Sequence, residues 1–254
     1  MIMTELCALS GFYSPAQRAR FLQAVGRRFS VRTFTGEADP AKLAALQYAA
    51  EKVALPGVRI VIGKCEEHKL YKKLPGVPAI SGTGYYAAVI ADSAHPRARY
   101  HAGISGEAFV LEAVSLELGT CWIGSFKKRG VKIPLNKNEK VLAVISFGTF
   151  ENQTTHRKRK KLTDICSQDP AQWPLWAYNA AECVRNAPSA INLQPWYMSF
   201  AGRTMILQKK GLGTQLDMGI ALLHMSLGVG EKDHVIHWEE GKKVASLLAE
   251  DQIL

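Results

Sequence analysis

Residues Ala187 to Trp196 have the sequence Ala-Pro-Ser-Ala-Ile-Asn-Leu-Gln-Pro-Trp, and the rest of the chain is organised around this stretch. A helix is predicted from Leu175 to Asn186. Pro188 cannot continue it, because proline lacks the N–H group and clashes with the preceding turn. Pro195 favours an extended backbone at the residue before it, so a strand can start at Trp196. The stretch therefore predicts a helix end that passes directly into a β-strand.

The segment between the two prolines carries short polar side chains, those of Ser189, Asn192 and Gln194. Side-chain amides both donate and accept hydrogen bonds, which suits the amide and imide edges of a flat heterocycle. The same residues also fit a polar helix end that binds no ligand. Taken alone, the pattern leaves both interpretations open.

Length and composition fit a globular protein with one large domain or two intimate ones. No run of about 18 apolar residues occurs, so no membrane span is expected. The first residues also lack the basic start of a signal peptide. The five cysteines show neither Cys-x-x-Cys nor Cys/His metal spacing, which predicts reduced thiols in a cytoplasmic protein without a metal site. The net charge of +10 leaves an anionic ligand or a nucleic acid open as a partner.

A second motif, Arg-Arg-Phe-Ser-Val-Arg at residues 27–32, follows a helix predicted to begin at Ser14-Pro15. If the motif is extended, side-chain alternation places Arg28, Ser30 and Arg32 on one face. Two guanidinium groups and a hydroxyl on one face form a clamp for a phosphate group. A single motif of this kind is a weak signal, because a solvated strand edge has the same pattern.

Two further segments carry candidate binding residues. Residues 120–126, Thr-Cys-Trp-Ile-Gly-Ser-Phe, contain Gly124, and a glycine lets the backbone approach a ligand closely. A glycine-bounded turn with a core tryptophan explains that segment equally well. Residues 156–161, His-Arg-Lys-Arg-Lys-Lys, contain five consecutive bases, a pattern typical of nucleic-acid contact or of a solvated tail.

Together, these four segments resemble the FMN-dependent nitroreductase family, and the similarity is most specific over residues 187–196. In that family the basic motif after the first helix and a later Arg/Lys stretch hold the FMN phosphate, while the Ser/Asn/Gln string touches the flavin of the partner subunit. The resemblance implies flavin contacts from the following residues of this chain: Arg27, Arg28, Ser30, Arg32, Trp122, Ile123, Gly124, Arg157, Arg159, Pro188, Ser189, Ala190, Asn192 and Gln194.

The resemblance also implies the chemistry. NADH or NADPH would reduce FMN, and a small-molecule electron acceptor such as a nitroaromatic or a quinone would reoxidise it. No catalytic side chain is expected, since the flavin carries the reaction. The alternatives are a flavin-holding protein without turnover and a basic nucleic-acid-binding protein. Aromatic residues are not interleaved with the basic runs, so nucleic acid is not expected as a partner.

The chain also repeats itself. Residues 49–53, Ala-Ala-Glu-Lys-Val, correspond to residues 180–184, Ala-Ala-Glu-Cys-Val, and Pro56 corresponds to Pro188. The resemblance is therefore to nitroreductases with two halves in one chain. It implies an α+β sandwich duplicated as a pseudo-dimer, with central antiparallel sheets flanked by helices. The expected halves are residues 1–166 and 167–254. A monomer is preferred because a fused pair can complete its own site, and a homodimer stays open.

Periodicity and turn residues predict the remaining elements. Helices are expected over residues 40–54, 104–118, 215–229 and 242–250, with a short one within 64–73. Gly119 is expected as the glycine that ends the helix over residues 104–118. Strands are expected over residues 58–62, 85–91, 141–147, 197–200, 204–208 and 235–238.

Overall fold

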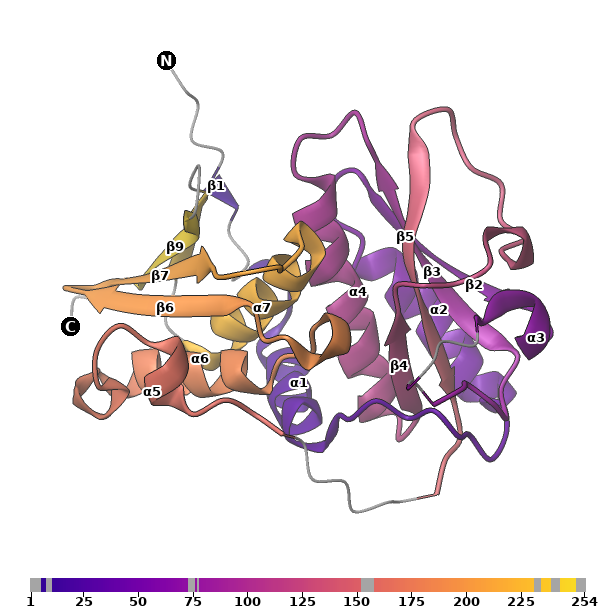
Figure 1. Cartoon of the computed structure of the whole chain (residues 1–254), viewed down its shortest axis with the longest axis horizontal. Coiled ribbons are helices and arrows are strands. Elements are labelled where there is room, and N and C mark those ends of the chain that lie inside the picture. The colour runs from indigo at the N-terminus through magenta and orange to yellow at the C-terminus, as the bar shows by residue number, and fades with distance from the viewer. Residues whose placement is uncertain are drawn as a thin grey trace. The chain divides into compact units, whose positions relative to one another are not determined.

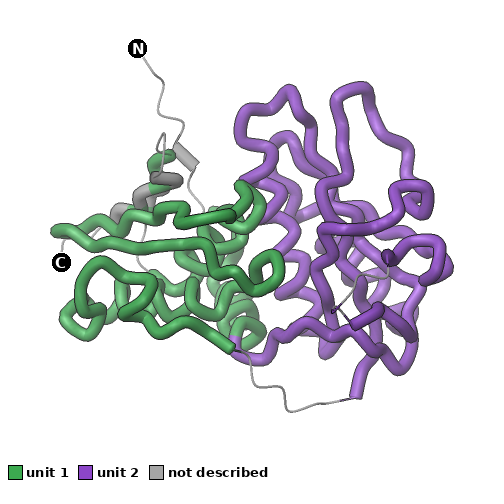
Figure 2. Tube along the Cα trace, viewed as in Figure 1, with its two compact units in different colours: residues 1–25, 158–254 green, residues 26–157 purple. Residues whose placement is uncertain are grey.

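The computed structural model describes residues 6–7, 11–72, 76, 78–151, 158–230, 234–238 and 243–249 (Figure 1). The chain divides into two compact units, which Figure 2 shows in different colours. Unit 1 comprises residues 1–25 and 158–254, and unit 2 comprises residues 26–157.

The contact-defined units differ from the expected halves, because residues 1–25 and 158–166 group with the later part of the chain. Hydrogen bonds within unit 1 explain the grouping of the first segment. The Tyr13 hydroxyl lies 2.6 Å from Ser226 Oγ. The Arg18 guanidinium donates from Nε and Nη2 to the Leu227 carbonyl, at 3.1 and 3.0 Å.

Unit 2 contains a four-stranded antiparallel sheet in the order β2-β3-β5-β4. The strands are β2 (Val58–Lys64), β3 (Tyr85–Asp92), β4 (Gly119–Ile123) and β5 (Glu139–Gly148). The central position of β3 fits its sequence, since six consecutive residues are buried on both faces. β4 was not predicted from the sequence. Its five residues form a strand by pairing with β5, and a segment this short carries little periodicity of its own.

Two helices flank this sheet. α2 (Pro40–Lys52) begins where the Asp39 side chain accepts a hydrogen bond from the Lys42 N–H at 2.9 Å. α4 (Ala98–Ser115) is buried around most of its circumference, and it contacts all four strands and α2. This burial agrees with the apolar sequence that predicted an interior helix.

The predicted bounds of α4 were wrong at both ends, and Gly119 does not end the helix. The chain leaves the helix at Glu117, whose φ is 62°, and the Leu118 N–H donates to the Ala113 carbonyl at 3.0 Å. This left-handed turn occupies the last helical carbonyls although the residue is not glycine. Gly119 is instead the first residue of β4.

Unit 1 contains a five-stranded antiparallel sheet in the order β1-β8-β9-β7-β6. The strands are β1 (Leu6–Cys7), β6 (Trp196–Ala201), β7 (Thr204–Lys209), β8 (His234–Trp238) and β9 (Lys243–Ala249). α6 (Leu175–Asn186) has the predicted bounds and packs on α7 (Gln215–Gly228). The helices approach closely at Gly228. A Cβ atom added there would lie only 2.5 Å from the Cα atom of Ala180.

The helix predicted over residues 242–250 was wrong, since β9 is a strand. β9 pairs with β7 on one side and β8 on the other. Ala245 and Leu247, two residues apart, are both fully buried, which is the period of a strand. Pairing with two neighbours outweighed the weak helical preference of this alanine- and leucine-containing segment.

The two units have the same order of elements. Unit 2 runs α2-β2-β3-α4-β4-β5, and unit 1 runs α6-β6-β7-α7-β8-β9. The sheet orders β2-β3-β5-β4 and β6-β7-β9-β8 also correspond. One difference is the connection from the first helix to the first strand, which is residues 53–57 in unit 2 and residues 187–195 in unit 1.

The remaining elements are short, apart from α1. They are α1 (Pro15–Arg27), α3 (Glu67–Leu70), η2 (Lys128–Gly130), α5 (Leu162–Ile165), η3 (Pro170–Gln172) and η4 (Ala190–Asn192). Within the described ranges, no helix has both the length and the apolar character needed to cross a bilayer.

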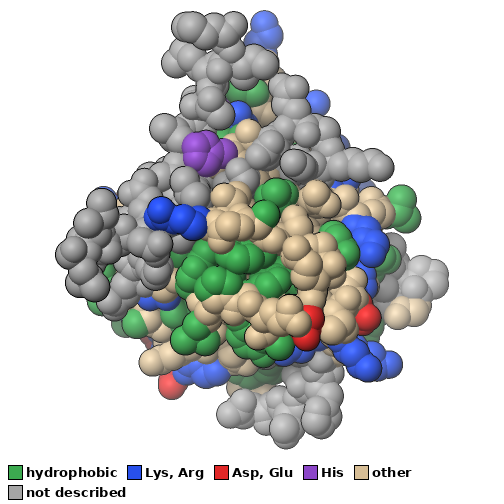
Figure 3. Space-filling view, turned by 90° about the vertical axis from the view of Figure 1, so that its left-hand side faces the viewer, with side chains coloured by type: hydrophobic (Ala, Val, Ile, Leu, Met, Phe, Trp, Pro, Cys, Tyr) green, Lys and Arg blue, Asp and Glu red, His purple; other side chains and the backbone are tan. Residues whose placement is uncertain are grey.

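Apolar side chains also reach the surface. Figure 3 shows a face on which hydrophobic side chains gather near the centre, with Lys and Arg side chains at its border. In unit 1, Leu175 at the start of α6 is 74% exposed, and the neighbouring Trp176 ring packs edge-on against Phe200 at 5.6 Å. Exposed apolar groups of this kind bear on the oligomeric state, for which the monomer stays a prediction.

Candidate functional site

In unit 1, the basic segment at residues 158–160 is hydrogen-bonded to the Ser/Asn/Gln loop. Arg159 donates from Nη1 to Asn192 Oδ1 at 2.8 Å and from Nη2 to the Asn186 carbonyl at 3.0 Å. Asn192 in turn donates from Nδ2 to the Lys158 carbonyl at 2.9 Å. Arg159 therefore joins the end of α6 to the loop that follows it. Two of the sequence-predicted segments lie side by side.

Gln194 is the second point of attachment, and its side chain is only 4% exposed. Its Oε1 accepts from the Lys160 N–H at 2.9 Å, and its own N–H donates to Ser189 Oγ at 2.9 Å. The Lys160 ammonium donates to the carbonyls of Leu193 and Gln194, at 2.8 and 3.0 Å. Much of the predicted polar set therefore shapes the loop itself.

The backbone of this loop is strained. Ile191, Asn192 and Gln194 have φ values of 43°, 57° and 48°, in the region that favours glycine. Ile191 is the most unfavourable of the three because it is β-branched, and its side chain is 84% exposed. The Ala190 N–H donates to Asp217 Oδ1 at 2.8 Å, which attaches this part of the loop to α7. Backbone strain held by surrounding bonds concentrates at functional sites.

In unit 2, the Arg-x-Ser-x-Arg motif is extended, which is the condition under which its polar side chains were expected on one face. Ser30 pairs with Thr120 in a parallel bridge, and the Val31 N–H donates to the Thr120 carbonyl at 2.9 Å. The three polar side chains do not share one open face, however. Ser30 is exposed and Arg32 is half-buried, whereas Arg28 is 4% exposed.

Arg28 is buried in unit 2, where it faces a carboxylate that offsets the cost of burying its charge. Its Nε lies 3.8 Å from Oε1 of Glu107, which is fully buried in the middle of α4. The other oxygen, Oε2, accepts a hydrogen bond from Trp122 Nε1 at 2.8 Å. Burial lowers the pKa of Arg28, and the negative charge of Glu107 counteracts that effect.

No role was predicted for Glu107 from the sequence. A signal was present, because a carboxylate inside a helix that is apolar around most of its circumference needs a partner. The identity of that partner was not readable, since Arg28 and Trp122 lie on other elements.

The segment at β4 surrounds this cluster. Burial raises the pKa of the Cys121 thiol, and the nearby Arg32 and Arg28 charges and the Ser30 hydroxyl oppose the shift. Ile123 is half-buried and Gly124 is exposed. A Cβ on Gly124 would meet no described atom within 4 Å, so the backbone there is open to a ligand.

The other predicted site residues are placed as follows. Arg27 is exposed at the last position of α1, Pro188 is buried, and Ala190 is exposed. Arg157 lies outside the described residues. The structure thus groups the predicted residues into one set in unit 2 and one set in unit 1.

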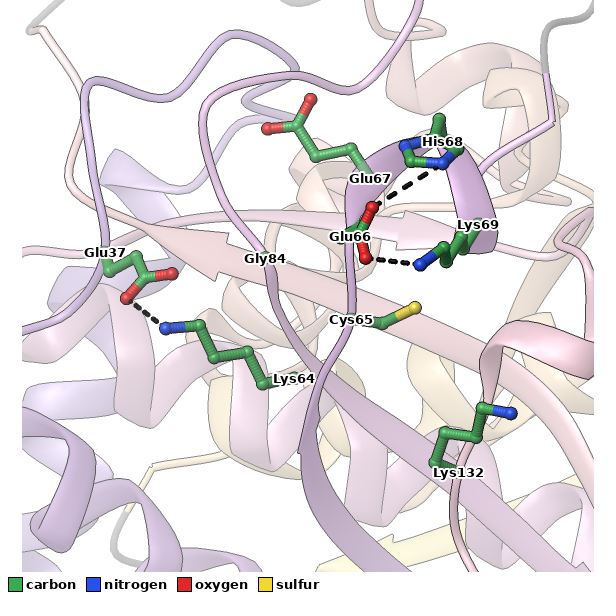
Figure 4. A pocket seen from close by; sticks show the side chains of 9 residues that line it. All are labelled: Glu37, Lys64, Cys65, Glu66, Glu67, His68, Lys69, Gly84 and Lys132. Atoms are coloured by element: carbon green, nitrogen blue, oxygen red, sulfur yellow. Dashed lines mark hydrogen bonds and ion pairs between the residues drawn. The ribbon is translucent and has the colours of Figure 1, made fainter.

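Unit 2 also has an open pocket, which none of these residues lines (Figure 4). Lys64 Nζ lies 2.8 Å from Glu37 Oε2, and His68 Nε2 lies 3.6 Å from Glu66 Oε2. Lys69 also pairs with Glu66. The pocket's charges are therefore largely paired with each other. Among the described residues, no group of His, Cys, Asp and Glu side chains could hold a metal ion.

Comparison with known proteins identifies the family. The model described as "Putative TM nitroreductase" matches residues 20–229, so the chain belongs to this nitroreductase family. A "putative nitroreductase" from Thermotoga maritima MSB8 is 23% identical, with a TM-score of 0.63 over 90% of this chain and 93% of that chain. The chain therefore has a nitroreductase-like α+β fold. No curated protein matches it.

Two other similar structures cover a smaller part of the chain. A "Putative NADH dehydrogenase/NAD(P)H nitroreductase" from Bacteroides thetaiotaomicron has 19% identity and a TM-score of 0.46, over 60% of this chain and 97% of that chain. A nitroreductase with bound FMN from Desulfitobacterium hafniense has 16% identity and a TM-score of 0.42, over 56% and 94%.

Proposed function

We propose that the protein is an FMN-dependent oxidoreductase that passes a hydride from NADH or NADPH, through the flavin, to a small oxidised acceptor such as a nitroaromatic or a quinone. Family membership supports the class of reaction. The observation that carries the proposal is the loop at residues 189–194. Its strained backbone is held by hydrogen bonds from Arg159 and Lys160 and to Asp217. Backbone strain that is maintained in this way is typical of a functional site and not of a loop that only connects two elements.

The residues present fit FMN. Ser30 and Arg32 offer a hydroxyl and a guanidinium group for the phosphate, and Arg27 is exposed beside them. Arg157 and Arg159 would add charge from the basic segment. Trp122, Ile123 and Gly124 would face the ring, where the open backbone at Gly124 allows close approach. Pro188, Ser189, Ala190, Asn192 and Gln194 would supply the contact from unit 1.

When bound, FMN would supply the hydride-accepting ring atom, and the protein would bind and orient it. Exposed Ser30 would donate to a phosphate oxygen, and Arg32 would neutralise phosphate charge. The amide-bearing loop would present backbone and side-chain polar groups to the ring edge. No side chain is required to move a proton.

We also propose that the chain is a fused pseudo-dimer with one complete flavin site. The matching order of elements and sheets in the two units supports duplication. The Ser/Asn/Gln string occurs only in the connection after α6, and the Arg-x-Ser-x-Arg motif occurs only before α2. A single polypeptide could thus act as a monomer. A cytoplasmic location is proposed from the free thiols of Cys65, Cys121, Cys166 and Cys183.

The visible absorption spectrum of the purified protein tests the proposal directly. We expect a yellow protein with a flavin spectrum that NADH or NADPH bleaches under anaerobic conditions and that a quinone restores. A flavin spectrum without bleaching would indicate a protein that holds flavin without turnover. A colourless protein that does not take up added FMN would contradict the proposal, and binding to single-stranded nucleic acid would then favour the alternative class.

The double variant Ser30→Ala/Arg32→Ala tests the proposed phosphate contacts. Neither side chain is fully buried, so the fold should persist, while the dissociation constant for FMN should rise by about 10-fold to 100-fold, as expected for two lost charge-assisted contacts. Lys128→Ala/Arg129→Ala removes exposed basic residues elsewhere in unit 2 and serves as the control. Equal FMN affinity in the two double variants would contradict the assignment.

A further inference from the structure

We infer that Glu107 is a positioning residue of the proposed flavin site, which fixes Trp122 and balances the charge of Arg28. The inference rests on the proposed function, because Trp122 is one of its proposed flavin contacts. Glu107 itself is fully buried in α4 and would act through these two side chains.

The geometry gives each carboxylate oxygen a separate partner. Oε2 accepts from Trp122 Nε1 at 2.8 Å, and Oε1 lies 3.8 Å from Arg28 Nε. These partners belong to β4 and to the segment after α1, so one buried side chain joins three parts of unit 2. The first contact is a short hydrogen bond, and the second is an ion pair at longer range.

Packing restricts Trp122 from another side. A Cβ on Gly106 would lie 2.3 Å from Cη2 of the Trp122 ring, so the indole rests directly on α4. The ring thus has glycine beneath it and a carboxylate at its N–H. These contacts hold one edge of the indole against α4 and so fix the position of the ring.

Charge distinguishes this role from simple packing. A buried ion pair is weak evidence for stability, since apolar residues of similar volume are often as stable. The carboxylate does keep the buried Arg28 charge neutralised. With Gln at position 107, Arg28 would remain positive without that balance and would favour the more negative, reduced flavin over the oxidised one.

The experiment compares dissociation constants for oxidised and reduced FMN in the full-length protein and in Glu107→Gln. We expect weaker binding of oxidised FMN by about tenfold with little change for reduced FMN. That tenfold change in the ratio raises the two-electron midpoint potential by about 30 mV. The control, Glu112→Gln, removes the same charge from a half-buried position of the same helix and should leave both constants unchanged.

Two results would overturn the inference. One is a pair of constants within twofold of wild type, and the other is an equal rise in both, which a merely structural role predicts. Trp122→Phe keeps the ring but removes the N–H donor. It should weaken oxidised FMN binding, and adding Glu107→Gln to it should weaken binding by less than the two separate effects combined. If Glu107→Gln does not fold, unchanged binding in Trp122→Phe would overturn the inference.

A wild-type protein that binds no FMN would contradict the proposed function without testing the role of Glu107. The contact itself is then tested in the flavin-free protein. The indole N–H resonance of Trp122, identified by its loss in Trp122→Phe, should shift in Glu107→Gln and not in Glu112→Gln. An unchanged resonance would show that Glu107 does not position the ring.

Discussion

At the scale of single residues, Gln194 holds one end of the strained loop in place. It accepts from the Lys160 N–H and donates its own N–H to Ser189, and its side chain is nearly inaccessible to solvent. A buried group bonded in this way is costly to remove, because the former partner remains buried without a hydrogen bond. Its left-handed backbone is maintained by the same contacts.

The substitution Gln194→Ala is expected to lower the free energy of unfolding by about 1–3 kcal/mol, because the Lys160 N–H loses its acceptor. It should also lower FMN retention, since the loop would relax. Urea unfolding and flavin content measure the two effects. Gln172→Ala, at an exposed position in the same unit, is the control and should change stability by less than about 0.5 kcal/mol. Equal effects of the two variants would contradict the structural role of Gln194.

At the scale of elements, close helix packing sets the geometry on which the loop depends. α6 ends where the loop begins, and α7 supplies Asp217, which holds the Ala190 N–H. The two helices approach at Gly228, where a side chain would collide with the backbone of Ala180. A shift of α6 would therefore move the proposed flavin contact.

The substitution Gly228→Ala is expected to destabilise the protein by about 1–3 kcal/mol, because the new methyl group forces α6 and α7 apart. Gly26→Ala is the matched control in α1. A Cβ there meets no described atom within 4 Å, and the position is the second-last of α1, so the substitution should leave stability unchanged or raise it by less than about 0.5–1 kcal/mol. Thermal unfolding of both variants measures this difference. Stabilisation of both variants would contradict the close packing of α6 on α7.

At the scale of the whole molecule, two units with the same topology carry different functional segments. Unit 2 contains the early basic motif and unit 1 contains the amide-bearing loop. The corresponding connection in unit 2, residues 53–57, is shorter and contains neither Asn nor Gln. Divergence of this kind would leave a duplicated chain with a single complete site.

We therefore expect saturated protein to hold one FMN per chain. Flavin released by acid can be quantified by absorbance against protein concentration from amino-acid analysis. Light scattering of the same sample should give the mass of a single chain. Two flavins per chain would contradict the loss of the second site, and one flavin per two chains would contradict the self-sufficient monomer.

The sequence by itself determined the features that depend on local chemistry. The bounds of α6 and the start of α2 at Asp39 follow from proline and capping residues. Family membership was also predictable, because the string at residues 187–196 is specific.

Only the tertiary structure decided features that depend on partners distant in the chain. β9 is a strand because two neighbouring strands pair with it, and β4 exists only through β5. The pairing of Glu107 with Arg28 and Trp122 likewise joins residues whose separation in sequence hides their contact. Local preferences are worth a fraction of a kcal/mol per residue, so non-local pairing and burial override them.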